Sequence, residues 1–109
     1  MRLIPAVFAA SVLVAALAAA AGQTMASTEQ GRILVVRLCA QCHGFDKADR
    51  SPHAAAPPLR RLEPRVDLDD LEQRLREGIL AGHPDMPMFK LSRQEAHSVV
   101  QYLRAIRAD

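Results

Sequence analysis

The first amphipathic pattern begins at Ser27 and ends at the first cysteine of the chain. Ser27 carries a hydroxyl and Gln30, three residues later, an amide, which is the pattern of a capping box at a helix start. An apolar stripe at helical spacing follows, and it has no side chain at its first position. Its members are Gly31, Leu34, Val35 and Leu38. We therefore expect a helix that begins at Ser27 and delivers Cys39 to its end.

Two further helices are predicted in the second half of the chain. Asp67 is the expected N-cap of one helix, which should stop between Gly78 and Gly82. Ser92 and Glu95 form a second capping box at the start of the last helix. The apolar stripes of these two helices are Leu68, Leu71, Leu75 and Ile79, and then Ala96, Val99, Val100, Leu103 and Ile106.

The segments between the helices show no strand-like alternation. Residues 44–66 contain four prolines and no sustained period, so we expect a loop of 23 residues. A loop of that length in a small domain is expected to wrap around something. Residues 83–91 hold two prolines within four positions and are predicted to be non-helical. The sequence thus predicts an all-α domain with long connections.

Residues 1–26 have the layout of a secretory signal peptide. Arg2 precedes an uncharged run from Leu3 to Ala21, and small residues follow. Cleavage is expected after Ala26, with Ala21 as the alternative site, which leaves one domain at residues 27–109. An uncleaved membrane anchor is the less favoured alternative, because nine of the 19 residues in the run are alanine and Pro5 interrupts its start. We expect an exported, periplasmic protein that is soluble after cleavage.

The composition of residues 27–109 limits the possible partners and the size of the core. Without Arg2 the segment has 13 basic and 12 acidic residues, so net charge gives no argument for binding nucleic acid or a membrane. It has one tyrosine, no tryptophan and two phenylalanines. A domain with so little large apolar volume commonly depends on a cofactor or a covalent link for stability.

Cys39, Cys42 and His43 form a C-x-x-C-H motif that holds both cysteines of the chain. This is the attachment signature of c-type haem, in which two thiols form thioethers and the adjacent imidazole binds the iron. A redox-active C-x-x-C is expected in a setting with strands, and none is predicted here. A zinc site would need two of the four histidines as well, and these lack the usual spacing. The motif therefore favours one covalent haem.

The second iron ligand has five candidates. They are Met86, Met88, His83, His53 and His97. The two methionines flank Pro87 in a segment expected to be non-helical. Only one of them can be the second ligand of the iron.

The order of several motifs resembles small class I monohaem cytochromes of the c type. The motifs are "CAQCHG", "PPL", "DMPMF" followed by "LS", and "QYLRAI" in the last helix, and together they cover residues 27–109. The resemblance implies about three helices and a long loop around one covalent haem. It makes His43 the proximal ligand and Met86 the distal ligand, with Met88 as the fallback, and it makes the carbonyl of Pro57 the hydrogen-bond acceptor of the proximal imidazole.

The resemblance also assigns a structural role to Gly31, which should let the first and last helices cross closely, next to Tyr102 and Leu103. One feature of many relatives is missing, because the chain has no tryptophan to meet a haem propionate. The candidates for that contact are Arg60, Arg61 and Arg65.

The function implied by this resemblance is electron transfer. Iron with both His43 and Met86 bound has no position for a substrate, and the thioether ligand raises the potential relative to bis-histidine haem. We expect a non-enzymatic monomer that carries electrons from a dehydrogenase or quinol-oxidising complex to an oxidase or reductase. The alternatives are a dedicated cytochrome subunit of an exported dehydrogenase and, less favoured, a haem sensor or peroxidase-like protein with an open distal site.

Overall fold

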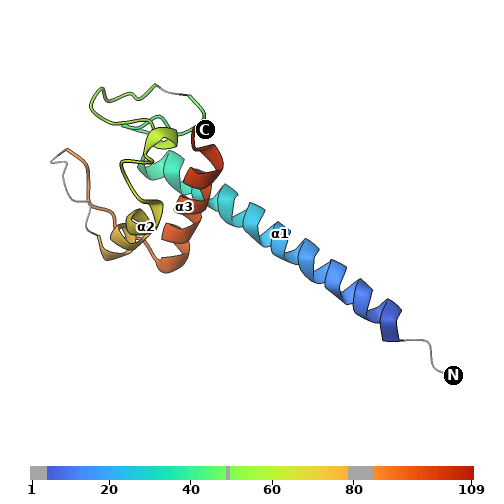
Figure 1. Cartoon of the computed structure of the whole chain (residues 1–109). Helices are drawn as coiled ribbons and strands as arrows, with labels where there is room; N and C mark the ends of the chain where they lie inside the picture. Colours follow the sequence, from blue (N-terminus) through green and yellow to red (C-terminus); the bar gives the residue numbers. More distant parts are fainter. Residues whose placement is uncertain (1–4, 49, 79–84) are drawn as a thin grey trace.

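The structure, a computed structural model, describes residues 5–48, 50–78 and 85–109, with the backbone alone for residues 5–10. The described part contains three α-helices, one 3₁₀ turn and no strand, in the order α1, η1, α2, α3. Figure 1 shows α2, α3 and the end of α1 packed together, while the N-terminal part of α1 projects away from them. The predicted all-α class is confirmed.

Helix α1 spans Pro5–Leu38, so the prediction that it begins at Ser27 is wrong for the whole chain. The alanine-rich run before Ser27 favours helix, and the single glycine within it, Gly22, does not end the helix. Because the preceding turn is already helical, Ser27 does not act as a cap. Its hydroxyl lies 3.2 Å from that of Ser98 instead, and the Thr28 hydroxyl donates to the carbonyl of Thr24 at 3.0 Å.

Helix α3, Arg93–Ile106, crosses the end of α1 and forms the main interface of the domain. The capping box of Ser92 and Glu95 is present at its start, as predicted. The helices approach so closely at Gly31 that a β-carbon there would lie 1.8 Å from the carbonyl oxygen of Ser98 and 3.0 Å from the β-carbon of Tyr102. Glycine at position 31 is thus required by the backbone of α3 more than by the side chain of Leu103.

Helix α2, Leu68–Glu77, packs against α3 as well. The Asp67 carboxylate accepts hydrogen bonds from the backbone N–H groups of Asp69 and Asp70, as its predicted role as N-cap requires. Gly78 ends the helix with φ 79°, the left-handed conformation that glycine adopts without strain. Ile79, the last predicted member of the α2 stripe, lies outside the described residues.

The buried core joins the three helices and one turn of the long loop. The 3₁₀ turn η1, Leu59–Arg61, lies within the segment predicted as loop and contributes Leu59 to the core. The other buried apolar residues come from α1, α2 and α3. They are Leu34, Val35, Leu68, Leu75, Ala96, Val99, Val100, Tyr102, Leu103 and Ile106.

Candidate haem site

The C-x-x-C-H motif occupies the turn that ends α1. The N–H of Cys39 donates to the Val35 carbonyl at 2.8 Å, which continues the helix, and the N–H of His43 donates to the Cys39 carbonyl at 2.9 Å. The chain therefore completes one further turn after α1. This turn places Cys39 and Cys42 about one helical turn apart and His43 directly after them.

No disulfide joins Cys39 and Cys42, and both residues are half-buried. Burial raises the pKa of the Cys39 thiol to about 11. Reactive and metal-binding thiols have a lowered pKa, because the thiolate is the reactive form. The environment of Cys39 is therefore unlike that of a catalytic thiol and suits a sulfur atom that ends in a neutral thioether.

The imidazole of His43 is oriented by the long loop. Its Nδ1 lies 2.7 Å from the carbonyl oxygen of Pro57, which is the pair that the resemblance predicted. A carbonyl oxygen only accepts hydrogen bonds, so Nδ1 carries the proton and Nε2 keeps its lone pair for a metal. Two neighbouring contacts fix this part of the loop: the N–H of Gly44 donates to the Ser51 hydroxyl and the N–H of Leu59 donates to the Gly44 carbonyl, both at 2.9 Å.

The methionine segment is attached to α2 at its far end. The N–H of Leu91 donates to the carbonyl of Leu75 at 2.8 Å. Residues 85–91 are neither helix nor strand, as predicted. Met86 is half-buried, whereas 76% of Met88 is exposed. The two methionines that the sequence left open thus differ clearly in environment.

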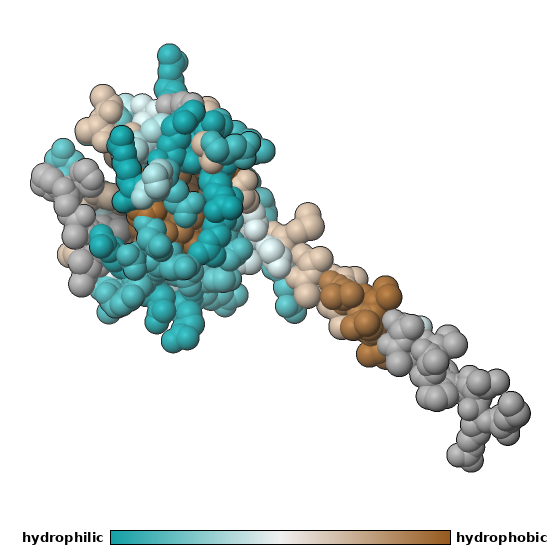
Figure 2. All heavy atoms as spheres, viewed as in Figure 1, coloured by the Kyte–Doolittle hydropathy of each residue, from teal (hydrophilic) through white to brown (hydrophobic). Residues whose placement is uncertain are grey.

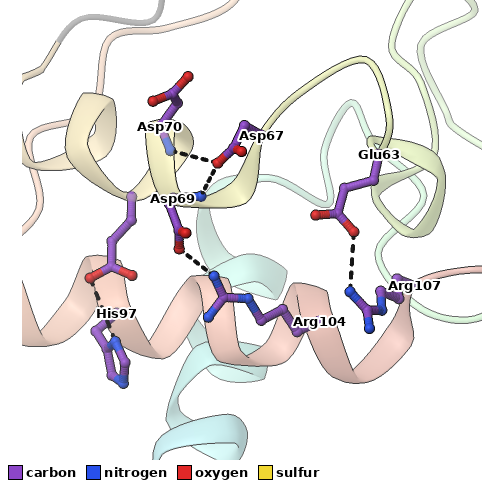
Figure 3. A network of polar contacts seen from close by, with 8 residues as sticks. Glu63, Asp67, Asp69, Asp70, His97, Arg104 and Arg107 are labelled. Atoms are coloured by element: carbon purple, nitrogen blue, oxygen red, sulfur yellow. Dashed lines mark hydrogen bonds and ion pairs between the residues drawn. The ribbon is translucent and has the colours of Figure 1, made fainter.

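The remaining histidine candidates lie in different surroundings. His53 is exposed in the long loop, and His97 is exposed on α3, where its Nδ1 lies 3.5 Å from the carboxylate of Glu72 (Figure 3). His83 lies outside the described residues. Figure 3 also shows Arg104 paired with Asp69, so His97 belongs to a row of polar contacts between α2 and α3.

Several apolar residues next to the core remain partly uncovered. Figure 2 shows hydrophobic residues between hydrophilic ones on the face of the domain turned to the viewer. The partly buried apolar residues packed against the core are Leu38, Cys39, Phe45, Leu62, Leu71 and Leu91. Covering such a surface with a large apolar group would stabilise a domain of this size. The two cysteines, the oriented imidazole and this apolar surface together fit a covalently bound haem.

One contact at the site was not foreseen from the sequence. The hydroxyl of Tyr102 on α3 donates to the carbonyl of Phe45, two residues after His43, at 2.6 Å. It ties the segment that follows the motif to the last helix. The signal was present, because Tyr102 is the only tyrosine, occupies the apolar face of a helix and needs a partner for its hydroxyl when buried.

The three arginines predicted to meet a haem propionate differ in their surroundings. Arg60 belongs to η1, and its Nη1 donates to the carbonyl of Lys47 at 2.6 Å. Arg61 and Arg65 are exposed.

Comparison with known proteins agrees with this site. Residues 26–103 match the family model described as cytochrome c oxidase, cbb3-type, subunit III. The protein is a monohaem c-type cytochrome. A cytochrome c-552 of Bradyrhizobium diazoefficiens is 31% identical over 96 residues, which are 87% of this chain and 90% of the relative. No solved structure matches the chain. Membership of the family implies covalently bound haem c, and the cytochrome is therefore an electron-transfer protein.

Proposed function

We propose that the cytochrome is exported and carries single electrons, with His43 as the proximal and Met86 as the distal iron ligand. The observation that carries this proposal is the 2.7 Å contact between His43 Nδ1 and the Pro57 carbonyl. Such an acceptor holds the imidazole ring in one orientation, fixes its tautomer and makes its other nitrogen a stronger ligand. A surface histidine without a ligand role has no need of this arrangement.

The choice of Met86 rests on burial. Met86 is half-buried, whereas Met88 is 76% exposed and its side chain meets water. Of the two side chains, only that of Met86 is partly covered by the domain. With His43 and Met86 both engaged, no position at the iron is left for a substrate. The bound haem supplies one-electron exchange between the ferric and ferrous states, and a thioether ligand favours the ferrous state.

Residues 1–26 are proposed to be a signal peptide that is removed on export. Part of α1, Ser11–Leu38, is long and apolar enough to cross a membrane, a property that signal sequences share. Residues 11–26 are exposed, and the half-buried contacts of the domain begin at Ser27. Cleavage after Ala26 would therefore leave the described packing of α1 on α3 intact. The mass of the protein recovered from the periplasm distinguishes this site from cleavage after Ala21 and from a retained anchor.

The partners are proposed to be redox proteins of a respiratory chain, and two arrangements remain. The relative is named as a cytochrome in its own right, which supports a free carrier. The description of the family model names an oxidase subunit, which supports a dedicated subunit of a complex. Purification of the untagged protein at physiological salt separates them, because a carrier elutes as a monomer and a subunit elutes with its complex.

The ligand set is tested by the visible spectra of the haem-loaded protein and of Met86→Ala, with Met88→Ala as the matched control. We expect a low-spin c-type spectrum with the weak far-red band of methionine ligation in the wild type and in Met88→Ala. Met86→Ala should lose this band and gain high-spin character. If only Met88→Ala loses the band, Met88 and not Met86 is the distal iron ligand. A high-spin wild type would overturn electron transfer and favour a sensor or catalyst.

A further inference from the structure

We infer that Arg107 and Ala108, the two residues after α3, hold the carbonyl of Pro57 against the imidazole of His43. We call these two residues the strap. They are positioning residues, because they act on the imidazole through the long loop and do not touch it. The inference rests on the proposed function, since it explains how the proposed proximal ligand is kept in its orientation.

The strap leaves α3 next to the turn η1. Helix α3 ends at Ile106, and Arg107 has φ −54° and ψ 145°, so the chain continues in an extended conformation. The N–H of Ala108 then donates to the carbonyl of Arg60 at 2.8 Å, and Ala108 is half-buried. Figure 1 shows the C-terminus beside η1. This hydrogen bond joins the end of α3 to the middle of η1.

A second contact of the strap lies at the surface. Nη1 of Arg107 donates to Oε2 of Glu63 at 3.4 Å, as Figure 3 shows. The two side chains are 59% and 37% exposed, so water screens the pair and its contribution is small. The hydrogen bond of Ala108 is therefore the main contact of the strap.

The path from Arg60 back to Pro57 is short and stiff. Only Pro58 and Leu59 lie between these two residues, and the rings of Pro57 and Pro58 fix their φ angles. The N–H of Arg61 donates to the Pro58 carbonyl at 3.0 Å, which closes the turn. Neither proline has an N–H with which to fix its own position. A displacement of Arg60 should therefore displace the Pro57 carbonyl as well.

The strap and the haem-binding motif hold this segment from different sides. The N–H of Leu59 donates to the carbonyl of Gly44 at 2.9 Å, but Gly44 directly follows His43 and moves with it. The strap instead connects the segment to α3, which belongs to the buried core. Pro57 and Ala108 line the same open pocket on the surface. The strap thus gives the carbonyl a fixed position relative to the core.

The position of this carbonyl affects the electronic properties of the ligand. A strong hydrogen bond from Nδ1–H of His43 makes the imidazole more basic, and a more basic ligand favours the ferric state. Loosening the strap should weaken this bond and shift the iron toward the ferrous state. A contact that only stabilises the fold would have no such effect.

Ala108→Pro removes the N–H of the strap and tests its role. The ψ of 145° at Arg107 is compatible with a proline at the next position. In a redox buffer of fixed potential, the ratio of ferrous to ferric protein should rise by about threefold. Ala108→Ser keeps the N–H and is the matched control, so its ratio should equal that of the wild type.

The Nδ1 proton of His43 provides a second readout. NMR of the ferrous protein measures its exchange with solvent, which should be about fivefold faster in Ala108→Pro than in the wild type. Arg104→Ala is the control for stability alone, because it removes the pair with Asp69 between α2 and α3. It should lower the unfolding midpoint slightly and leave the redox ratio and the proton exchange unchanged.

Hydrogen exchange of the wild type tests the same coupling without a variant, in case Ala108→Pro does not fold. In low concentrations of guanidinium, the N–H of Ala108 and the Nδ1 proton of His43 should exchange with the same dependence on denaturant, because one opening exposes both. If Ala108 exchanges freely while the Nδ1 proton stays protected, the strap does not hold the carbonyl.

The outcomes separate the inference from the proposed function. An unchanged redox ratio and unchanged proton exchange in Ala108→Pro would overturn the role of the strap, and so would equal effects of Ala108→Ser. In either case a low-spin spectrum with the methionine band would leave the electron-transfer proposal intact. A high-spin wild type would overturn the proposed function itself.

Discussion

Gly31→Ala tests the closest contact in the fold. A β-carbon at this position would lie 1.8 Å from the carbonyl oxygen and 2.5 Å from the carbonyl carbon of Ser98. These are backbone atoms in the middle of α3, so no rotamer change relieves the contact. To reach the 3.4 Å of an ordinary contact, α1 and α3 must move apart by about 1.6 Å.

Two effects of opposite sign decide how much Gly31→Ala changes the free energy of unfolding. Alanine favours a helix over glycine by about 1 kcal/mol. Separation of the helices loosens the buried layer around Val35 and Val100, and overpacking of this kind costs about 3 kcal/mol when backbone must move. We therefore expect a net loss of about 2 kcal/mol in the free energy of unfolding, which for a domain of this length lowers Tm by about 8–16 °C.

The assay is guanidinium unfolding of the haem-loaded protein followed by far-ultraviolet circular dichroism. Gln30→Ala, an exposed neighbour on α1, is the control and should change the free energy by less than about 0.5 kcal/mol. The sign of the change in the free energy of unfolding separates helix propensity from the steric contact. Helix propensity alone predicts that Gly31→Ala stabilises the protein. A variant as stable as the wild type would refute the close crossing of α1 and α3.

Substitutions at three further positions test other contacts by the same assay. Tyr102→Phe leaves the carbonyl of Phe45 without its 2.6 Å partner and should cost about 1–1.5 kcal/mol, so an unchanged midpoint would contradict that hydrogen bond. Gly78→Ala places a side chain on a residue with φ 79° and should cost about 1 kcal/mol. Gly78→Asn should cost less, because asparagine tolerates this conformation. Equal losses would argue against the left-handed cap. Arg104→Ala removes the exposed pair with Asp69 and should cost no more than about 1 kcal/mol, and a larger loss would mean that its side chain contributes packing as well.

Much of the fold followed from local patterns in the sequence. The caps at Asp67 and Ser92 were predicted and are confirmed, and α2 ends at Gly78, within the predicted range of Gly78 to Gly82. Each of these signals acts within about four residues along the chain, so the sequence alone contains the whole interaction. The C-x-x-C-H motif is local in the same sense, and for that reason the cofactor could be predicted without a structure.

The predicted start of α1 was wrong because the capping-box pattern at Ser27 follows residues that are themselves helical. A capping box acts only where the preceding residues leave the helix, and the run before Ser27 continues it. In the whole chain the helix begins at Pro5, while the packed part of it begins near Ser27. Helix boundaries therefore depend on what is attached to the domain as well as on the capping residues.

The site itself was decided by contacts between distant residues. His43 meets Pro57 across 14 positions, and Tyr102 meets Phe45 across 57. Nothing in the spacing along the chain fixes such contacts, because they depend on how a proline-rich loop closes and on which helix it packs against. The difference between Met86 and Met88 has the same origin, since both have the same residue type and the same proline neighbour. The sequence by itself determined the helices and the cofactor, and its resemblance to small c-type cytochromes implied Met86 and the Pro57 acceptor. Only the tertiary structure determined that Met86 is half-buried and that the imidazole meets Pro57, because burial and loop closure depend on the whole chain.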